Sequence, residues 1–295
     1  MKSADTCCIV VAFNPDLEQL CKVIESILKW SQRVILVDNT PNASYLANIL
    51  NKHNVDVIQV GKNIGIGAAQ NIGISKAMNQ GFHWIVLSDQ DTLYPENYGL
   101  LMKNRLENQK NACAIAPTFI DAHRLGGEII KATIPAWHGW KKILPPSGVF
   151  DLYEAAASGL MIKASSLEYV GLMNEQLFID WVDFEWCWRA RAAGFRVLGV
   201  SDIKVNHSLG VGAISIGGKV INIRPPSRHY YIVRNCIYLS INSNYLNFIA
   251  RLRLLFKSCI FLIGYSLLFS PRLENLHAVM LGLRDGVLGR LGRQF

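Results

Sequence analysis

Short apolar runs alternate with segments of helical periodicity through the first 90 residues, and no other feature constrains the fold as strongly. The apolar runs occupy residues 7–13, 33–37, 55–60 and 83–87, and helical spacing falls at 16–30, at 44–53 and in the stretch that ends at residue 77. The first run, CCIVVAF, is apolar throughout, as expected for a strand buried on both faces. The alternation predicts an α/β fold with a mostly parallel, doubly wound central sheet flanked by helices.

Polar residues follow the predicted strands where such a sheet binds its ligands. Asn14, Asp38, Asp89 and Asp91 each come just after one of the apolar runs. In an open α/β sheet, ligands lie beyond the carboxyl ends of the strands. Any one of these residues alone would be ordinary loop chemistry. Their repetition at several strand ends favours a functional site.

Asp89 and Asp91 stand two residues apart, directly after the apolar run at 83–87. Two carboxylates in this arrangement can both reach one divalent cation. Oxygen ligands suit Mg²⁺ or Mn²⁺, which bind through one or two carboxylates together with substrate phosphates. A metal held in this way can neutralise a leaving diphosphate. The alternative interpretation is a pair of solvated turn aspartates.

The pattern becomes irregular over residues 118–150, to which the sequence assigns no role, and then sharpens again. Residues 158–162 and 195–200 are strand-like, and a helix is predicted over 183–193, ended by Gly194. Apolar residues make up 51% of the chain and charged residues 18%, which excludes a disordered protein. The seven cysteines include no C-x-x-C pair, which disfavours a disulfide framework or a structural zinc site.

The excess of positive charge is confined to the end of the chain. Residues 224–295 hold 10 Lys and Arg against 2 Asp and Glu, whereas residues 1–223 hold 20 of each. The uncharged run 258–269 has 12 residues, short of the roughly 20 that span a bilayer. We therefore expect one or two helices lying on a membrane surface, with anionic lipid near four arginines: Arg272, Arg284, Arg290 and Arg293. A packed helical cap or a homo-oligomer interface is the alternative.

The N-terminus has no signal-peptide pattern, so the protein is expected in the cytoplasm, at the inner face of the plasma membrane. Nucleic acid is disfavoured as a partner, because the sequence shows no dedicated basic-aromatic stripe.

Six segments occur in the order found in inverting family-2 glycosyltransferases of the GT-A fold. They are VVAFN, VILVDN, GKNIGIGAAQNIGI, LSDQD, ASGLMI and FIDWVDFEWCWRARAAGF. The resemblance covers roughly residues 7–240 and is closest to the bacterial dTDP-rhamnosyltransferases of O-antigen and related polysaccharide synthesis. It implies a GT-A domain over residues 1–240, followed by an amphipathic, basic helical segment over 241–295.

The resemblance also implies a reaction. A sugar, L-rhamnose from dTDP-L-rhamnose, would be transferred with inversion to a saccharide acceptor carried on a polyprenyl diphosphate lipid. Mg²⁺ or Mn²⁺ would be the cofactor. A galactofuranosyl or hexosyl nucleotide is the alternative donor, and a catalytically silent, membrane-associated binding protein is the alternative from another class.

Family resemblance assigns roles to individual residues. Asp38 would bind the nucleobase, and the other donor contacts would be Asn63, Gly65, Asn71, Asp89, Arg228, Tyr231 and Arg234. Asp91 would be the main metal ligand, with Asp89 and His207 beside it. The acceptor or sugar would meet Ser158, Gly159, Trp181 and Glu185. A nicotinamide-binding fingerprint at Gly65 is rejected because Gln70 replaces its third glycine.

Asp183 is the candidate general base, since inverting transfer needs a carboxylate that removes the acceptor's proton. It starts a predicted helix, whose N-terminus would stabilise its ionised form. Val182 stands where the family more often has Glu, which leaves Asp180 and Glu185 as alternatives. A purely structural N-terminal helix cap is the other interpretation of Asp183.

Overall fold

A computed structural model describes residues 3–42, 46, 50, 54–121, 128–136, 139–207, 213–216, 219–222 and 224–294. Its strands are β1 (Ser3–Ala12), β2 (Ser31–Asp38), β3 (Val55–Gln59), β4 (Trp84–Asp89), β5 (Ala112–Asp121), β6 (Glu128–Ile129), β7 (Ala132–Ala136), β8 (Gly139–Ile143), β9 (Val149–Leu152), β10 (Met161–Lys163), β11 (Arg196–His207), β12 (Ala213–Ile216) and β13 (Lys219–Asn222). Its helices are α1 (Leu17–Leu28), α3 (Ile66–Asn79), α4 (Tyr98–Glu107), α5 (Ala164–Val170), η1 (Glu175–Leu177), α6 (Val182–Ala192), α7 (Pro226–Asn242), α8 (Phe248–Ile260), η2 (Phe261–Tyr265), α9 (Ser266–Leu268) and α10 (Arg272–Val287).

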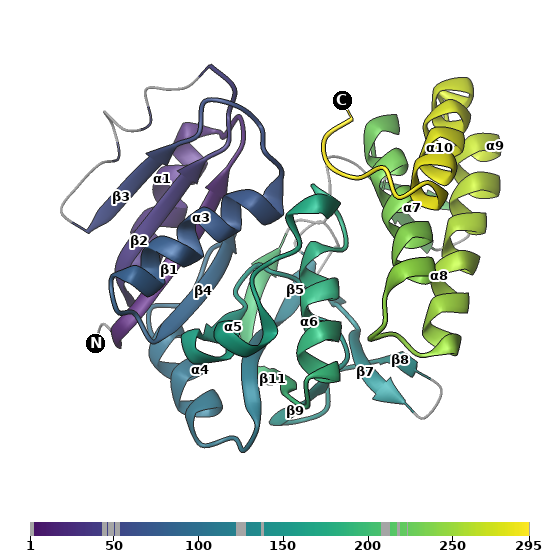
Figure 1. Ribbon diagram of the computed structural model, residues 1–295. Coiled ribbons are helices and arrows are strands. Elements are labelled where there is room, and N and C mark those ends of the chain that lie inside the picture. Colours follow the sequence, from purple (N-terminus) through teal and green to yellow (C-terminus); the bar gives the residue numbers. More distant parts are fainter. Residues whose placement is uncertain are drawn as a thin grey trace.

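A nine-stranded sheet forms the centre of the molecule (Figure 1). Its order is β3-β2-β1-β4-β10-β5-β11-β9, and β6 pairs with β5 at one side. Strands β3, β2, β1, β4, β5 and β11 run in one direction, whereas β10, β9 and β6 run against them. The prediction of a mostly parallel α/β sheet is confirmed. Of the strand predicted at 158–162, only Met161 and Ile162 lie in a strand, the short antiparallel β10 between β4 and β5, and residues 158–159 form a turn before it.

Alternate side chains of β1 enter two hydrophobic cores, which explains why the run is apolar on both faces. Cys7, Ile9 and Val11 pack with α3, α5 and α6 on one side of the sheet. Cys8 and Val10 pack with α1 and α4 on the other side. Helices thus cover both faces, as the alternation predicts. Of the helix expected over 44–53, only Leu46 and Leu50 are described, and both are buried; the rest of that prediction lies outside the described residues.

The last helices stand together at one side of the molecule, away from β1, β2 and β3 (Figure 1). Helices α8 and α10 both pack on α7. Because α7 runs to Asn242, the division expected at residue 240 falls in its last turn, and that division stays a prediction. Among the described helices, none combines the length and the apolar character needed to cross a bilayer.

Candidate active site

The loop after β4 is fixed by the glutamine between its two aspartates. The Phe13 N–H donates to Gln90 Oε1 at 2.8 Å, and Gln90 Nε2 donates back to the Phe13 carbonyl at 3.4 Å. Gln90 therefore ties the loop to the end of β1. Asp89 is partly buried and Asp91 is exposed, so both carboxylates lie at the carboxyl edge of the parallel strands, where the sequence places them.

A short segment before β10 links this loop to α6. The Asp89 N–H donates to Ser158 Oγ at 3.4 Å, and the buried Ser158 hydroxyl also lies 2.7 Å from Thr92 Oγ1. The neighbouring Ala157 N–H donates to Asp183 Oδ2 at 3.0 Å. Two consecutive residues thus contact both the metal-loop residue Asp89 and the candidate base. The buried hydroxyl of Ser158 orders this segment.

Asp183 lies in the first turn of α6 and is partly exposed. Burial of its carboxyl raises its pKa from 3.8 to about 7, and the negative charge of Asp89 acts in the same direction. The backbone N–H groups of Ala157 and Phe184 oppose this shift but do not cancel it. The N–H groups at the start of α6 thus favour the ionised form, as the sequence predicts, but desolvation outweighs them. A carboxylate with a pKa near 7 can both hold and release a proton at neutral pH.

The loop that leads into α6 has an unusual backbone. Phe178, Asp180 and Trp181 all have positive φ, at 64°, 63° and 69°. Non-glycine residues rarely adopt this conformation, which persists only where surrounding contacts impose it. Asn235 of α7 supplies such contacts, because its Nδ2 donates to the carbonyls of Leu177, Ile179 and Asp180 at 3.0–3.1 Å. Sequence patterns alone assign no individual role to Asn235.

The two alternative bases have structural partners. Asp180 forms a two-pronged ion pair with Arg228, in which both N···O distances are 2.7 Å. Arg228 therefore holds the strained loop, and its assignment to the donor stays a prediction. Glu185 is only 1% exposed and accepts hydrogen bonds from Arg189 Nε at 2.7 Å and from the Tyr245 hydroxyl at 2.8 Å.

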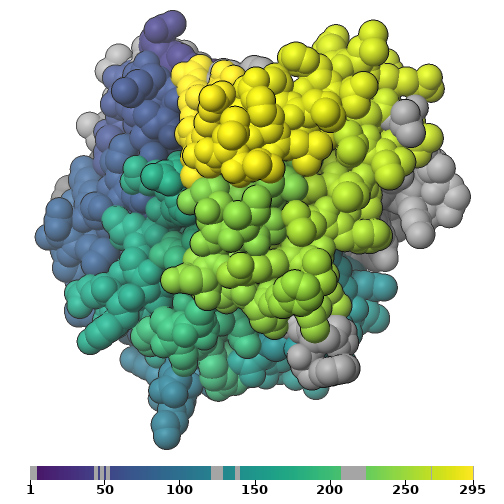
Figure 2. Space-filling model, turned by 45° about the vertical axis from the view of Figure 1, so that its right-hand side comes forward, coloured from purple at the N-terminus to yellow at the C-terminus, as the bar shows by residue number. Residues whose placement is uncertain are grey.

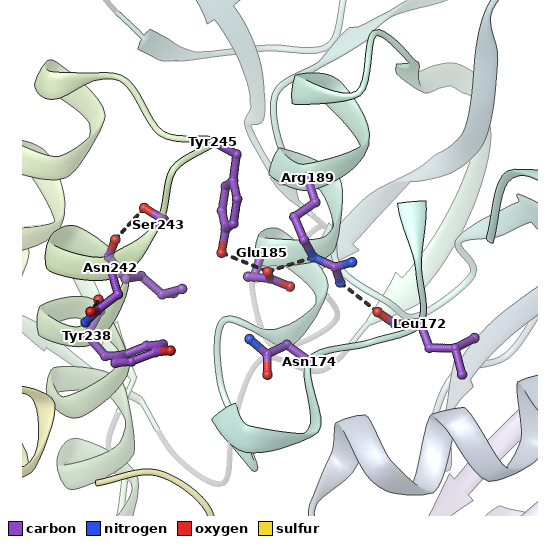
Figure 3. Close-up of a pocket in the computed structure, with 9 residues that line it drawn as sticks. Leu172, Asn174, Glu185, Arg189, Tyr238, Asn242, Ser243 and Tyr245 are labelled. Atoms are coloured by element: carbon purple, nitrogen blue, oxygen red, sulfur yellow. Dashed lines mark hydrogen bonds and ion pairs between the residues drawn. The ribbon is translucent and has the colours of Figure 1, made fainter. Parts of the chain in front are cut away.

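Figure 3 shows Glu185, Arg189 and Tyr245 pointing toward one another at a small cavity between α6 and α7. The cavity has a volume of about 340 Å³. Asp183 instead contacts Ala157, so the two acidic residues of the first turn face different surroundings. Glu185 Oε2 has no hydrogen-bond partner among the described residues, and the assignment of Glu185 to the acceptor stays a prediction.

Asp38 and Asn39 lie at the end of β2, where the sequence predicts donor binding. Asp38 is fully buried, and its Oδ1 accepts the Thr40 N–H at 3.0 Å. Asp38 Oδ2 is buried without a hydrogen-bond partner among the described residues. Asn39 Nδ2 donates to Asn63 Oδ1 at 3.1 Å, and Asn39 Oδ1 accepts the Ile64 N–H at 2.9 Å. The loop after β3 is thus bound to the end of β2.

Gly65 is required because another segment of backbone passes close to it. Its φ is +88°, and a Cβ atom there would lie 2.6 Å from the carbonyl oxygen of Phe178. The next residue, Ile66, donates its N–H to the same carbonyl at 2.7 Å. Gly65 therefore joins the loop after β3 to the strained loop before α6. Gly159 is similarly confined, since a Cβ atom there would lie 2.7 Å from the Tyr98 hydroxyl.

Asn71, one of the residues expected at the donor, supports the fold. Its Nδ2 donates to the Met173 carbonyl at 2.9 Å and to Glu175 Oε1 at 2.8 Å, and its Oδ1 accepts the Met173 N–H at 2.9 Å. Because the side chain is buried and its amide is used by these groups, the donor assignment is corrected: Asn71 fastens α3 to the segment before η1.

Arg234 also has a structural role. It is 0% exposed, and its guanidinium donates to the carbonyls of Leu177 at 2.8 Å and Gly292 at 2.5 Å. It cannot reach a diphosphate from this position, which corrects that assignment. Tyr231 is buried too, and its hydroxyl accepts the Gln294 N–H at 2.9 Å. Trp181 is 7% exposed and donates Nε1–H to the Ile232 carbonyl at 3.2 Å, so packing accounts for most of its surface.

His207 ends β11, but its side chain lies outside the described residues. The backbone of β11 comes close to the carboxylate loop, because Asn206 bridges to Leu93. Among the described side chains, no group of three or more His, Cys, Asp or Glu is arranged to hold a metal. Asp89 and Asp91 are the described oxygen donors, and two carboxylates match the ligand set that Mg²⁺ or Mn²⁺ uses with phosphate.

This architecture is that of the GT-A glycosyltransferases. The structure is similar to GalNAc-T7 solved with UDP, GalNAc and Mn²⁺, with a TM-score of 0.59 at 16% identity, covering 88% of this chain and 57% of that one. It is similar to S. aureus TarS 1–349 in complex with UDP-GlcNAc, with a TM-score of 0.60 at 15% identity, covering 97% and 81%. Against a longer TarS structure the TM-score is 0.61 at 16% identity, covering 98% of this chain, which spans only 49% of that one.

The family follows from the sequence comparisons. Residues 7–144 match the model of glycosyl transferase family 2. The chain is 31% identical over 286 residues to the "dTDP-rhamnosyl transferase RfbF" of Shigella flexneri, covering 96% of both chains. The chain therefore belongs to glycosyl transferase family 2, and the expected class of enzyme, a glycosyltransferase, is confirmed.

Proposed function

We propose that the protein transfers L-rhamnose from dTDP-L-rhamnose, with inversion, to a hydroxyl group of a saccharide acceptor. The observation that carries this proposal is the pairing of Asp183 with the carboxylate loop through Ala157 and Ser158. This pairing puts a base with a pKa of about 7 beside the end of β4. The rhamnosyl donor is supported by the name and the 31% identity of the Shigella relative.

Donor recognition would begin at Asp38. Its Oδ2 is buried without a described partner, and leaving such an acceptor unpaired costs about 1–3 kcal/mol. An N–H of the donor's base would satisfy it. The loop of Asn63 and Gly65, which Asn39 holds in place, forms the adjacent wall.

Asp89 and Asp91 would hold a divalent cation together with the donor's phosphates, with His207 as a further ligand. When bound, Mg²⁺ or Mn²⁺ neutralises the charge that develops on the leaving diphosphate. Gln90 supports this assignment, because its two hydrogen bonds with Phe13 fix the loop between the carboxylates.

Asp183 would accept the proton of the acceptor hydroxyl. The hydroxyl oxygen then forms a bond to the anomeric carbon as the bond from that carbon to the diphosphate breaks, and dTDP leaves with the electron pair. Asp180 and Glu185 are disfavoured for this role, because Arg228 binds the first and Arg189 with Tyr245 binds the second. Attack from the face opposite the leaving group gives inversion.

The acceptor is proposed to be a lipid-linked saccharide, with the protein bound to the inner face of the plasma membrane. A stripe of apolar side chains on α8 is exposed, including Phe256 at 68%, and α10 exposes Leu273 at 83%. The arginines of α8 are less available for lipid, because Arg251 donates to the Leu246 carbonyl and Arg253 to the Trp140 carbonyl. The exposed apolar side chains, together with the exposed Arg272 at the start of α10, would drive docking.

Flotation with vesicles of phosphatidylglycerol and phosphatidylethanolamine tests this docking. The wild type is expected to float with the vesicles, and a Phe256→Ser, Leu273→Ser double variant is expected to stay in the soluble fraction. Equal flotation of both proteins would remove this face from the proposal.

A donor screen tests the transfer itself. In the presence of Mn²⁺, dTDP-L-rhamnose is expected to raise the melting temperature of the purified protein more than UDP-galactofuranose or UDP-hexoses do. A larger rise with a UDP-sugar would replace the donor, and no release of nucleoside diphosphate from any donor with a saccharide acceptor would favour a silent binding protein.

A further inference from the structure

The last residues of the chain return from α10 to the loop that follows β3. We call residues 289–294 the C-terminal strap. In Figure 1 the C-terminus lies between the strands of the first half and the helices α7 and α10, and Figure 2 shows these yellow residues against the blue and purple ones. The strap therefore spans the two parts of the molecule.

Hydrogen bonds to α7 and to the segment before α6 hold the strap. The Gly292 N–H donates to the Gln176 carbonyl at 2.8 Å, and the Gln294 N–H donates to the Tyr231 hydroxyl at 2.9 Å. The buried guanidinium of Arg234 donates to the Gly292 carbonyl at 2.5 Å. Because Arg234 also binds the Leu177 carbonyl, one buried cation fixes both the strap and the segment that leads to Asp183.

Arg293 of the strap contacts the loop after β3, which includes Asn63 and Gly65. Arg293 Nη1 donates to the Asn63 carbonyl at 3.4 Å, and the Asn63 side chain binds Asn39, the residue after Asp38. Arg293 is exposed, and its guanidinium lies beside this loop. It comes from the opposite end of the chain, 230 residues away from Asn63.

We infer that Arg293 binds the diphosphate of the nucleotide donor and that the strap forms one wall of the donor site. This inference rests on the proposed function. A nucleoside diphosphate brings negative charge to an edge where Asp38, Asp89 and Asp91 already lie. The arginines that the sequence offers for that charge are engaged elsewhere: Arg228 by Asp180, and Arg234 by backbone carbonyls. Arg293, which follows the Gly292 that Arg234 binds, supplies the positively charged side chain instead.

Calorimetric binding of dTDP and of thymidine, with Mn²⁺ present, tests the inference on the full chain. Arg293→Gln is expected to weaken dTDP binding about 10-fold, the loss typical of one hydrogen bond to a charged group, and to leave thymidine binding unchanged. Arg272→Gln is the matched control, because it removes the same charge from the exposed start of α10 and should bind dTDP as the wild type does.

Unchanged dTDP affinity in Arg293→Gln would overturn the inference and leave the proposed function standing. An equal loss in Arg272→Gln would overturn it as well, because net charge would then explain the effect. A wild-type protein that binds UDP but not dTDP would contradict the proposed donor while the Arg293 comparison, repeated with UDP, still decides the role of the strap. If both variants melt at the same temperature as the wild type, misfolding does not cause the loss of dTDP affinity.

Discussion

Replacing Asp183 by Asn is expected to abolish transfer and, at the same time, to stabilise the protein. The amide cannot accept the acceptor's proton, so kcat should fall by about 10²–10⁴-fold, the usual contribution of a general base. In the wild type, activity requires the ionised carboxylate. Because its pKa is about 7, activity should fall about tenfold for each pH unit below 7.

The same pKa fixes the sign and size of the stability change. The folded state raises the pKa of Asp183 from 3.8 to about 7, so between these values it holds a proton that the unfolded chain has lost. The free energy of unfolding of the wild type therefore decreases as the pH rises through this window, by about 4 kcal/mol in total. The Asp183→Asn variant has no ionisable group at this position and would escape this loss. Its gain at pH 8 is at most that amount, because an amide oxygen cannot accept both the Ala157 and the Phe184 N–H as well as a carboxylate does.

Urea unfolding of the wild type and of Asp183→Asn at pH 5 and pH 8 measures this difference. The free energy of unfolding of the variant, relative to that of the wild type, should increase from pH 5 to pH 8. Its transfer activity should be absent at both pH values. If the stability of the variant relative to the wild type were lower at pH 8 than at pH 5, or equal at both, the raised pKa of Asp183 would be refuted. Full transfer by Asp183→Asn would remove the residue from the role of base.

Three further changes test other parts of the site. Asp91→Ala should lose metal-dependent transfer, as should wild-type protein treated with EDTA until Mn²⁺ is restored; full metal-dependent activity in the variant would remove Asp91 as a ligand. Gly65→Ala should lower the melting temperature well beyond Gly61→Ala, because both have positive φ but only Gly65 has a neighbouring backbone within 3 Å; equal melting temperatures would contradict the close approach. Asn71→Ala should cost about 3 kcal/mol in urea unfolding, since it leaves the Met173 N–H and carbonyl without their partner, and a loss below about 1 kcal/mol would show that water replaces the amide.

The central strands were predictable because each lies between two layers of helices. Side chains on both faces of β1 must then be apolar, which explains the uniformly apolar run that begins at Cys7. The carboxylates Asp89 and Asp91 were predictable for a related reason, since parallel strands bring their carboxyl ends to one edge. The direction of β10 was not, because a strand of three residues between two long ones carries no periodic signal.

The roles of the charged and amide residues around α7 could not be read from the sequence. Nothing local distinguishes an arginine that binds diphosphate from one that binds buried carbonyls, and only the fold brings Gly292 and Leu177 to Arg234. The strained loop at 178–181 is similar, because its positive φ values depend on bonds from Asn235, 56 residues away from Ile179.

Release of nucleoside diphosphate from dTDP-L-rhamnose, measured with a saccharide acceptor and Mn²⁺, is the decisive test of the proposed reaction. We expect acceptor-dependent release of dTDP by the wild type, no release by Asp183→Asn, and a rhamnosylated product of inverted anomeric configuration. Release by Asp183→Asn at the wild-type rate, or a product that keeps the donor's configuration, would contradict the proposed mechanism.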